Sequence, residues 1–154
     1  MSRERFDPRP YRGAGLTTTG SVSASAIASI TPASAEPLFL LEALVVAAVG
    51  TAVEQLDCAI REVASALVMD TTFDLLAESD SSDVAAAVFA MDESTPAVYG
   101  DGVYGRDAQP SLLGWRYNGP PLPLKPGTAY AIHQYNTLTV VTVLLCSVRV
   151  GEAF

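Results

Sequence analysis

The sequence predicts an all-β domain, and the last part of the chain carries most of that prediction. Residues 129–135 and 138–150 are apolar, rich in β-branched side chains and joined by a short polar turn, as two strands would be. One face of the second segment would carry Leu138, Val140, Thr142, Leu144, Cys146, Val148 and Val150, and the other Val141, Val143 and Leu145. A strand with two apolar faces belongs in the middle of a sheet, or where one face meets a partner chain.

Residues 1–16 predict an extended N-terminal arm, because arginine, proline and glycine occur there without any periodic pattern. Two interpretations of the arm stay open. It is either a solvated tail or a segment that orders on a partner. In the second case its cations and aromatic rings would make the contact, namely Arg3, Arg5, Phe6, Arg9, Tyr11 and Arg12.

The domain proper is expected over residues 17–154, and its first half contains the main ambiguity. A strand is expected over Val22 to Ile30, followed by turns at Pro32 and Pro37. Residues 38–68 fit either a hairpin of two strands around Gly50 and Thr51, or a long alanine-rich helix in an α+β fold. The hairpin is favoured, since apolar and polar residues alternate from residue 55 onward.

The second half begins with acidic segments around a predicted strand at Val84 to Met91. Residues 94–124 then form a long loop rich in glycine, proline and tyrosine. Four aromatic residues of this loop are candidates for a partner-binding or sugar-binding platform: Tyr99, Tyr104, Trp115 and Tyr117. The alternative is that these rings pack the loop onto the sheet, with residues 115–117 as a short strand. A turn at residues 125–128 leads into the final pair of strands.

Composition argues against several classes of function. The chain of 154 residues has a formal net charge of −8, and residues 1–12 alone contribute +2, which leaves −10 for the rest. Such an acidic body does not suit nucleic-acid binding. The apolar run at residues 38–53 is too short to span a membrane, and the residues before it do not form a secretory signal, so synthesis in the cytoplasm is expected.

The residues needed for common catalytic and metal sites are also not assembled. The only histidine is His133, in a predicted strand and without a nucleophile motif, so an enzyme is not expected. The two cysteines, Cys58 and Cys146, lie in apolar runs and suggest buried thiols, although a disulfide between them stays open. No cysteine–histidine spacing suggests zinc, and no cofactor is expected.

The order of these features resembles the capsid decoration, or cement, proteins of tailed phages. The comparable elements are the arginine-bearing arm from Arg3 to Arg12, the leucine-rich strand ending at residues 49–52, and the turn at residues 124–128 before a returning strand. The resemblance implies a single β-sandwich, jelly-roll-like, that binds the major capsid protein on the outer surface of the virion. It also implies a symmetric homo-oligomer, with a trimer favoured over a dimer.

Two alternative functions stay open at this point. One is another virion role, as a tail, neck or fibre-attachment component. The other is a carbohydrate- or receptor-binding β-sandwich module that uses the aromatic loop. Neither the arm nor the loop contains a motif that carries functional residues across from a known family.

Overall fold

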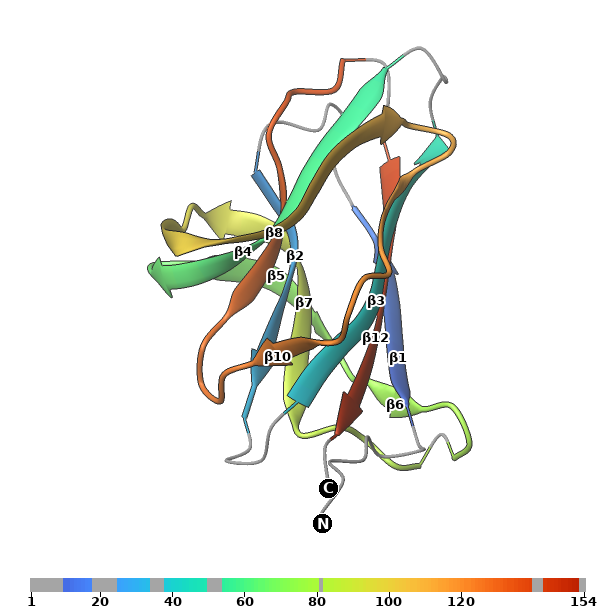
Figure 1. Ribbon diagram of the computed structural model, residues 1–154, viewed down its shortest axis with the longest axis vertical. Coiled ribbons are helices and arrows are strands. Elements are labelled where there is room, and N and C mark those ends of the chain that lie inside the picture. Colours follow the sequence, from blue (N-terminus) through green and yellow to red (C-terminus); the bar gives the residue numbers. More distant parts are fainter. Residues whose placement is uncertain are drawn as a thin grey trace.

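The protein is a two-layered β-sandwich, as Figure 1 shows for the computed structural model. The structure describes residues 10–17, 25–33, 38–49, 54–80, 82–139 and 143–152. The strands in these ranges are β1 (Tyr11–Leu16), β2 (Ser25–Pro32), β3 (Leu38–Val49), β4 (Gln55–Ser65), β5 (Val68–Phe73), β6 (Leu76–Ala77), β7 (Ala87–Thr95), β8 (Val98–Pro110), β9 (Trp115–Tyr117), β10 (Leu122–Leu124), β11 (Tyr130–Gln134) and β12 (Val143–Glu152).

Two antiparallel sheets of six strands make up the layers. In the first, which we call the β12 sheet, the order is β10-β3-β12-β1-β6, and β9 also pairs with β3. In the second, the β11 sheet, the order is β5-β7-β2-β11-β4-β8. The all-β prediction is therefore confirmed, and the helical alternative for residues 38–68 is wrong, because this stretch contributes β3 and β4.

The connectivity is that of a jelly roll. The chain passes from one sheet to the other at each step from β1 to β4, and again from β8 through β9 and β10 to β11 and β12. As a result, β12 lies between β1 and β3, and β11 lies between β2 and β4. Strands β5, β6 and β7 form an insertion that widens the β11 sheet beyond β2 and adds β6 to the edge of the β12 sheet.

This connectivity corrects the predicted hairpin. Strands β3 and β4 both exist, but each belongs to a different sheet, so they do not pair with each other. Because β3 has apolar residues on both faces, its sequence fits many positions in a sheet. The pattern of apolar residues therefore does not indicate which strand pairs with β3. The residues predicted to turn, Gly50 and Thr51, lie outside the described residues, as does the start of the strand expected from Val22.

The boundary of the N-terminal arm is also corrected. Residues 11–16 are not part of an extended arm but form β1, which pairs with β12 along its whole length, from Tyr11 opposite Val150 to Leu16 opposite Leu145. Two glycines in this strand leave room for the inserted strands. A Cβ atom at Gly13 would lie 2.6 Å from the Leu75 side chain, closer than packed atoms allow.

The main core lies between the sheets. In β12 the side chains of Leu144, Cys146, Val148 and Val150 are buried, as the period of two predicts, and the alternate side chains are only partly buried. The two cysteines are free, both fully buried. The turn expected at residues 125–128 is confirmed, since the Thr128 amide donates to the Lys125 carbonyl and Gly127 has a φ of 75°.

Candidate interaction surfaces

The arm residues predicted to bind a partner fall into two groups. Arg3, Arg5, Phe6 and Arg9 lie outside the described residues. Tyr11 is only 3% exposed, and its hydroxyl donates to Asp83 Oδ2 at 3.2 Å, so it belongs to the core rather than to a partner-binding arm. Arg12 is on the surface, where its Nε donates to Glu78 Oε1 at 3.0 Å within the same chain.

Two of the four loop aromatics pack around one glycine, and a third lies against the core, so they do not form an open platform. Trp115 is fully buried, and its indole Nε1 donates to the Gly105 carbonyl at 2.8 Å. The Tyr117 ring covers the same glycine, since a Cβ atom there would lie 2.7 Å from it. Tyr104 packs against the border of the main core. The prediction that Trp115 is a surface contact is therefore wrong, and the packing alternative describes it correctly.

Tyr99 lies apart from these three, on the outer face of the β11 sheet, in a stack of cations and rings. The Arg61 guanidinium carbon is 3.9 Å from the centre of the Tyr99 ring and 5.5 Å from that of Tyr135. The Arg106 guanidinium carbon is 3.8 Å from the Tyr135 centre. His133 meets the rings of Tyr99 and Tyr135 edge-on, with centroid separations of 5.0 and 4.7 Å.

This stack is a packed layer that fastens strands together. Small side chains beneath it, at Ala59 and Ala131, are fully buried, which lets the larger groups lie flat on the sheet. Burial, with the positive charges of Arg61 and Arg106, lowers the pKa of His133 to about 4. Arg106 is held in turn by Asp57 through contacts of 3.2 and 3.1 Å. Because β4, β8 and β11 all contribute, the layer joins one edge of the sheet to its middle.

Within the stack, several polar atoms are buried without a hydrogen-bond partner. They are Arg61 Nε, the Tyr99 hydroxyl and His133 Nδ1. Burial, together with the nearby negative charge of Glu93, raises the pKa of Tyr99 to about 12. These atoms have almost no surface exposed to solvent, so they do not form an open binding site.

The outer face of the β12 sheet has a different character, because apolar side chains run across its three central strands. The register defines three rows of outward side chains: Leu16, Leu145 and Val46; Ala14, Ser147 and Leu44; Arg12, Arg149 and Glu42. Leu16 is 50% exposed, and Val46, Leu44 and Leu145 are partly exposed. We call the first two rows the apolar face. An antiparallel sheet that faces water usually has polar residues at such positions.

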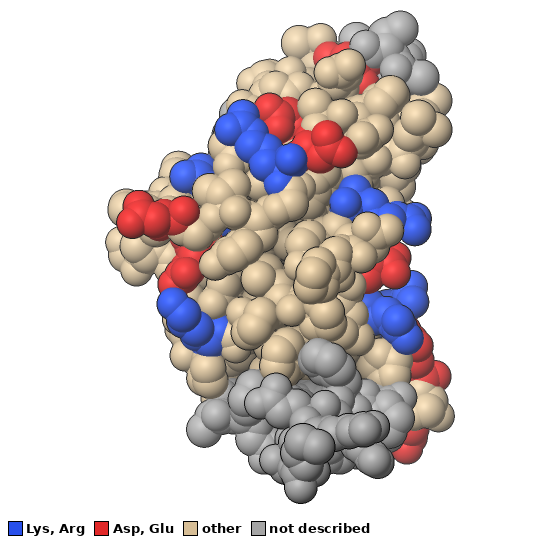
Figure 2. Space-filling model, in the orientation of Figure 1, with Lys and Arg blue, Asp and Glu red and all other residues tan. Residues whose placement is uncertain are grey.

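Charged groups border the apolar face. The Glu78 carboxylate accepts hydrogen bonds from both Arg12 and Arg149, each at 3.0 Å. Burial alone would raise the pKa of Glu78. The hydrogen bonds and positive charges of the two arginines outweigh this effect and lower the pKa. Arg116, next to Leu44 in the register, and Glu42 form no ion pair among the described residues. In Figure 2, basic and acidic groups lie along the right-hand side of the molecule, where Figure 1 places β1, β3 and β12.

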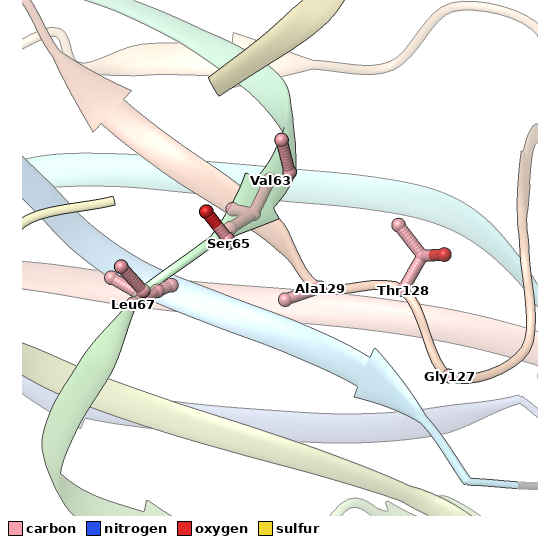
Figure 3. A pocket seen from close by; sticks show the side chains of 8 residues that line it. Val63, Ser65, Leu67, Gly127, Thr128 and Ala129 are labelled. Carbon is pink, nitrogen blue, oxygen red and sulfur yellow. The ribbon is translucent and has the colours of Figure 1, made fainter. Parts of the chain in front are cut away.

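One shallow pocket, of about 260 Å³, opens where β4 separates from β11. Figure 3 shows its walls, formed by residues 63–67 on one side and 127–129 on the other. None of these side chains is charged. Ala66 has a φ of 70°, in the left-handed region that favours glycine. The pocket thus has a strained backbone at Ala66. The hydroxyls of Ser65 and Thr128 are the polar side-chain groups among its lining residues.

Sequence reasoning found only part of these surfaces. The two apolar faces of the last strand indicated a possible partner contact through Leu145, whereas Leu16 and Val46 were assigned to an arm and to an ambiguous segment. The stack of Arg61, Tyr99 and Tyr135 had no sequence signal, because its members are far apart along the chain.

Two classes of site are not found in the part of the chain that the structure describes. No group of three or more histidine, cysteine, aspartate or glutamate side chains is positioned there to hold a metal ion. Nor do the same residues include a helix with the length and apolar character needed to cross a membrane. Comparisons of the chain with protein-family models, with curated proteins and with solved structures give no match.

Proposed function

We propose that this protein is a structural component of a phage virion, which binds the outer surface of the capsid and stabilises contacts between shell subunits. The observation that carries the proposal is the apolar face of the β12 sheet, with Leu16, Leu145 and Val46 in one continuous row. Exposed apolar patches on folded proteins mark sites where another protein binds. A function in an assembly uses such a face directly, and it requires no catalytic group.

The jelly-roll connectivity supports the proposal without deciding it. This fold occurs in viral capsid proteins, but also in lectins and cupins, so it is compatible with several functions. A protein that binds only the assembled shell stabilises it by mass action. Repetition over many equivalent sites multiplies a small contact energy. In this proposal the partner is the major capsid protein, and the protein acts on the virion as a homo-oligomer without enzymatic activity.

The carbohydrate-binding alternative has lost its main support. It required an accessible aromatic platform, but Trp115 is fully buried and Tyr99 lies in the packed stack on the other sheet. The substitution Trp115→Ala would therefore test stability rather than sugar binding. The alternative of a tail, neck or fibre-attachment role differs mainly in the number of copies per particle.

The first experiment is to count copies of this chain in purified particles by quantitative mass spectrometry against the major capsid protein. A ratio near one is the expected result. A handful of copies per particle would move the role to the tail or neck, and absence from the particles would overturn the virion proposal.

A second experiment addresses the arm. Because β1 begins at Tyr11, the deletion must stop at residue 9 to leave the sandwich intact. We expect the shortened protein to keep its melting temperature and to bind particles more weakly. Equal binding of the two proteins would show that Arg3, Arg5, Phe6 and Arg9 do not make the contact.

A further inference from the structure

We propose that the apolar face of the β12 sheet is where two copies of this chain meet. The clearest evidence is the row of Leu16, Leu145 and Val46, which crosses three neighbouring strands without a polar residue. The row beside it adds Ala14 and Leu44, interrupted only by a serine. Interfaces between proteins have this arrangement, with an apolar centre and charged groups at the rim.

The distribution of charge favours a second copy as the occupant. Two copies with a net charge of −8 each repel one another over most approaches. The charge at the rim of the apolar face differs from that of the whole chain, because positive groups outnumber negative ones there. The positive groups are Arg12, Arg116 and Arg149, and the negative ones are Glu42 and Glu78. At this surface two acidic molecules can approach without meeting further net negative charge. A surplus of one positive charge is also too small to attract a polyanion such as nucleic acid.

Two charges at the rim suggest how the copies are aligned. Glu42 precedes Leu44 by two residues on β3, Arg116 lies opposite Leu44 on β9, and neither forms an ion pair among the described residues. In a contact with twofold symmetry, each patch meets its own copy. Arg116 of one copy would then meet Glu42 of the partner subunit, and the reverse pair would form at the same time.

The leucine row can be tested on the isolated protein by analytical ultracentrifugation at tens of micromolar concentration. We expect the wild-type chain to self-associate, and Leu16→Lys to weaken the association by roughly tenfold or more. Val68→Lys is the matched control, because Val68 is also 50% exposed but lies in β5 of the other sheet. A monomeric wild type, or equal effects of the two lysines, would overturn the proposal.

The charge pair gives a second, independent test. Glu42→Arg alone should weaken self-association about fivefold or more, because two rim pairs are lost. Combining it with Arg116→Glu should restore the wild-type value, since the pair would be re-formed with its signs exchanged. If the double variant is weaker than the single one, the alignment across Leu44 is wrong.

The inference rests on the proposed function for its setting at the capsid surface, but the two can fail separately. Self-association through this face by a chain that is absent from particles would leave the inference standing and remove the virion role. If the chain is monomeric and Leu16→Lys lowers its occupancy on particles, the capsid protein covers the face. That result would overturn the inference and support the proposed function.

Discussion

Lowering the pH from 7 to 4.5 should destabilise this protein through His133. The imidazole lies against the rings of Tyr99 and Tyr135. Its burial there, with Arg61 and Arg106 nearby, lowers its pKa to about 4. In the unfolded chain the pKa is about 6.5, so between these values the unfolded state binds a proton that the folded state does not. Stability is therefore fully present above pH 6.5 and falls as the pH drops toward 4.

The size of the effect follows from the difference of about 2.5 between the two pKa values. One pKa unit corresponds to about 1.4 kcal/mol, which sets an upper limit near 3.4 kcal/mol. The imidazole is only partly buried, and solvent screening reduces such terms, so we expect about 1–2 kcal/mol. For a domain with a stability of about 5–15 kcal/mol, this loss is readily measurable.

The assay compares urea unfolding of the wild type and of His133→Gln at several pH values between 7 and 4.5. Carboxylates such as Glu78 titrate in both proteins, so the difference between the two pH profiles isolates the histidine. We expect the wild type to lose about 1–2 kcal/mol more than the variant. Because this is the only histidine, its proton resonances also report its pKa directly. Parallel pH profiles, or an imidazole midpoint near 6.5, would refute the reasoning.

Three further predictions concern stability and reactivity. Trp115→Ala should cost about 3–5 kcal/mol in thermal or chemical unfolding, because it empties a buried site, and a loss below 1 kcal/mol would contradict the burial. Burial raises the pKa of Cys146 to about 12 and also raises that of Cys58, so a disulfide-forming thiol reagent should modify neither in the native protein and both after denaturation. Ala66→Gly should stabilise by about 0.5–1 kcal/mol by relieving its positive φ, whereas the control Ala64→Gly, in β4 and without a positive φ, should destabilise.

The sequence predicted the fold class and several strands, because alternating apolar residues leave a readable pattern in each strand. The strand at 129–135 and the buried face of β12 were found in this way. Pairing between strands was harder to predict. The partner of a strand depends on where the chain passes from one sheet to the other, and no local sequence pattern encodes that step. The pairing of β3 and β4 failed for that reason.

β1 was missed for a specific physical reason. Its sequence holds two glycines and an arginine, which resemble a loop more than a strand. The glycines are needed because side chains of the insertion approach β1 closely: Leu75 at Gly13, and Phe73 and Met91 at Gly15. The strand is therefore specified by residues about 60 to 75 positions further along the chain. Likewise, the stack around Tyr99 needs side chains from three strands of one sheet.

The position of β12 between β1 and β3 has a consequence for how the molecule is made. Tyr11 pairs with Val150, so the first and last of the described strands meet only after nearly the whole intervening chain has been synthesised. Folds dominated by such distant pairings reach the native state slowly, in milliseconds to seconds. Until β12 emerges from the ribosome, β1 and β3 have no shared neighbour, and their apolar side chains stay available to other nascent chains. Production at high temperature or at high expression rates should therefore favour aggregation, and slower synthesis should raise the soluble yield.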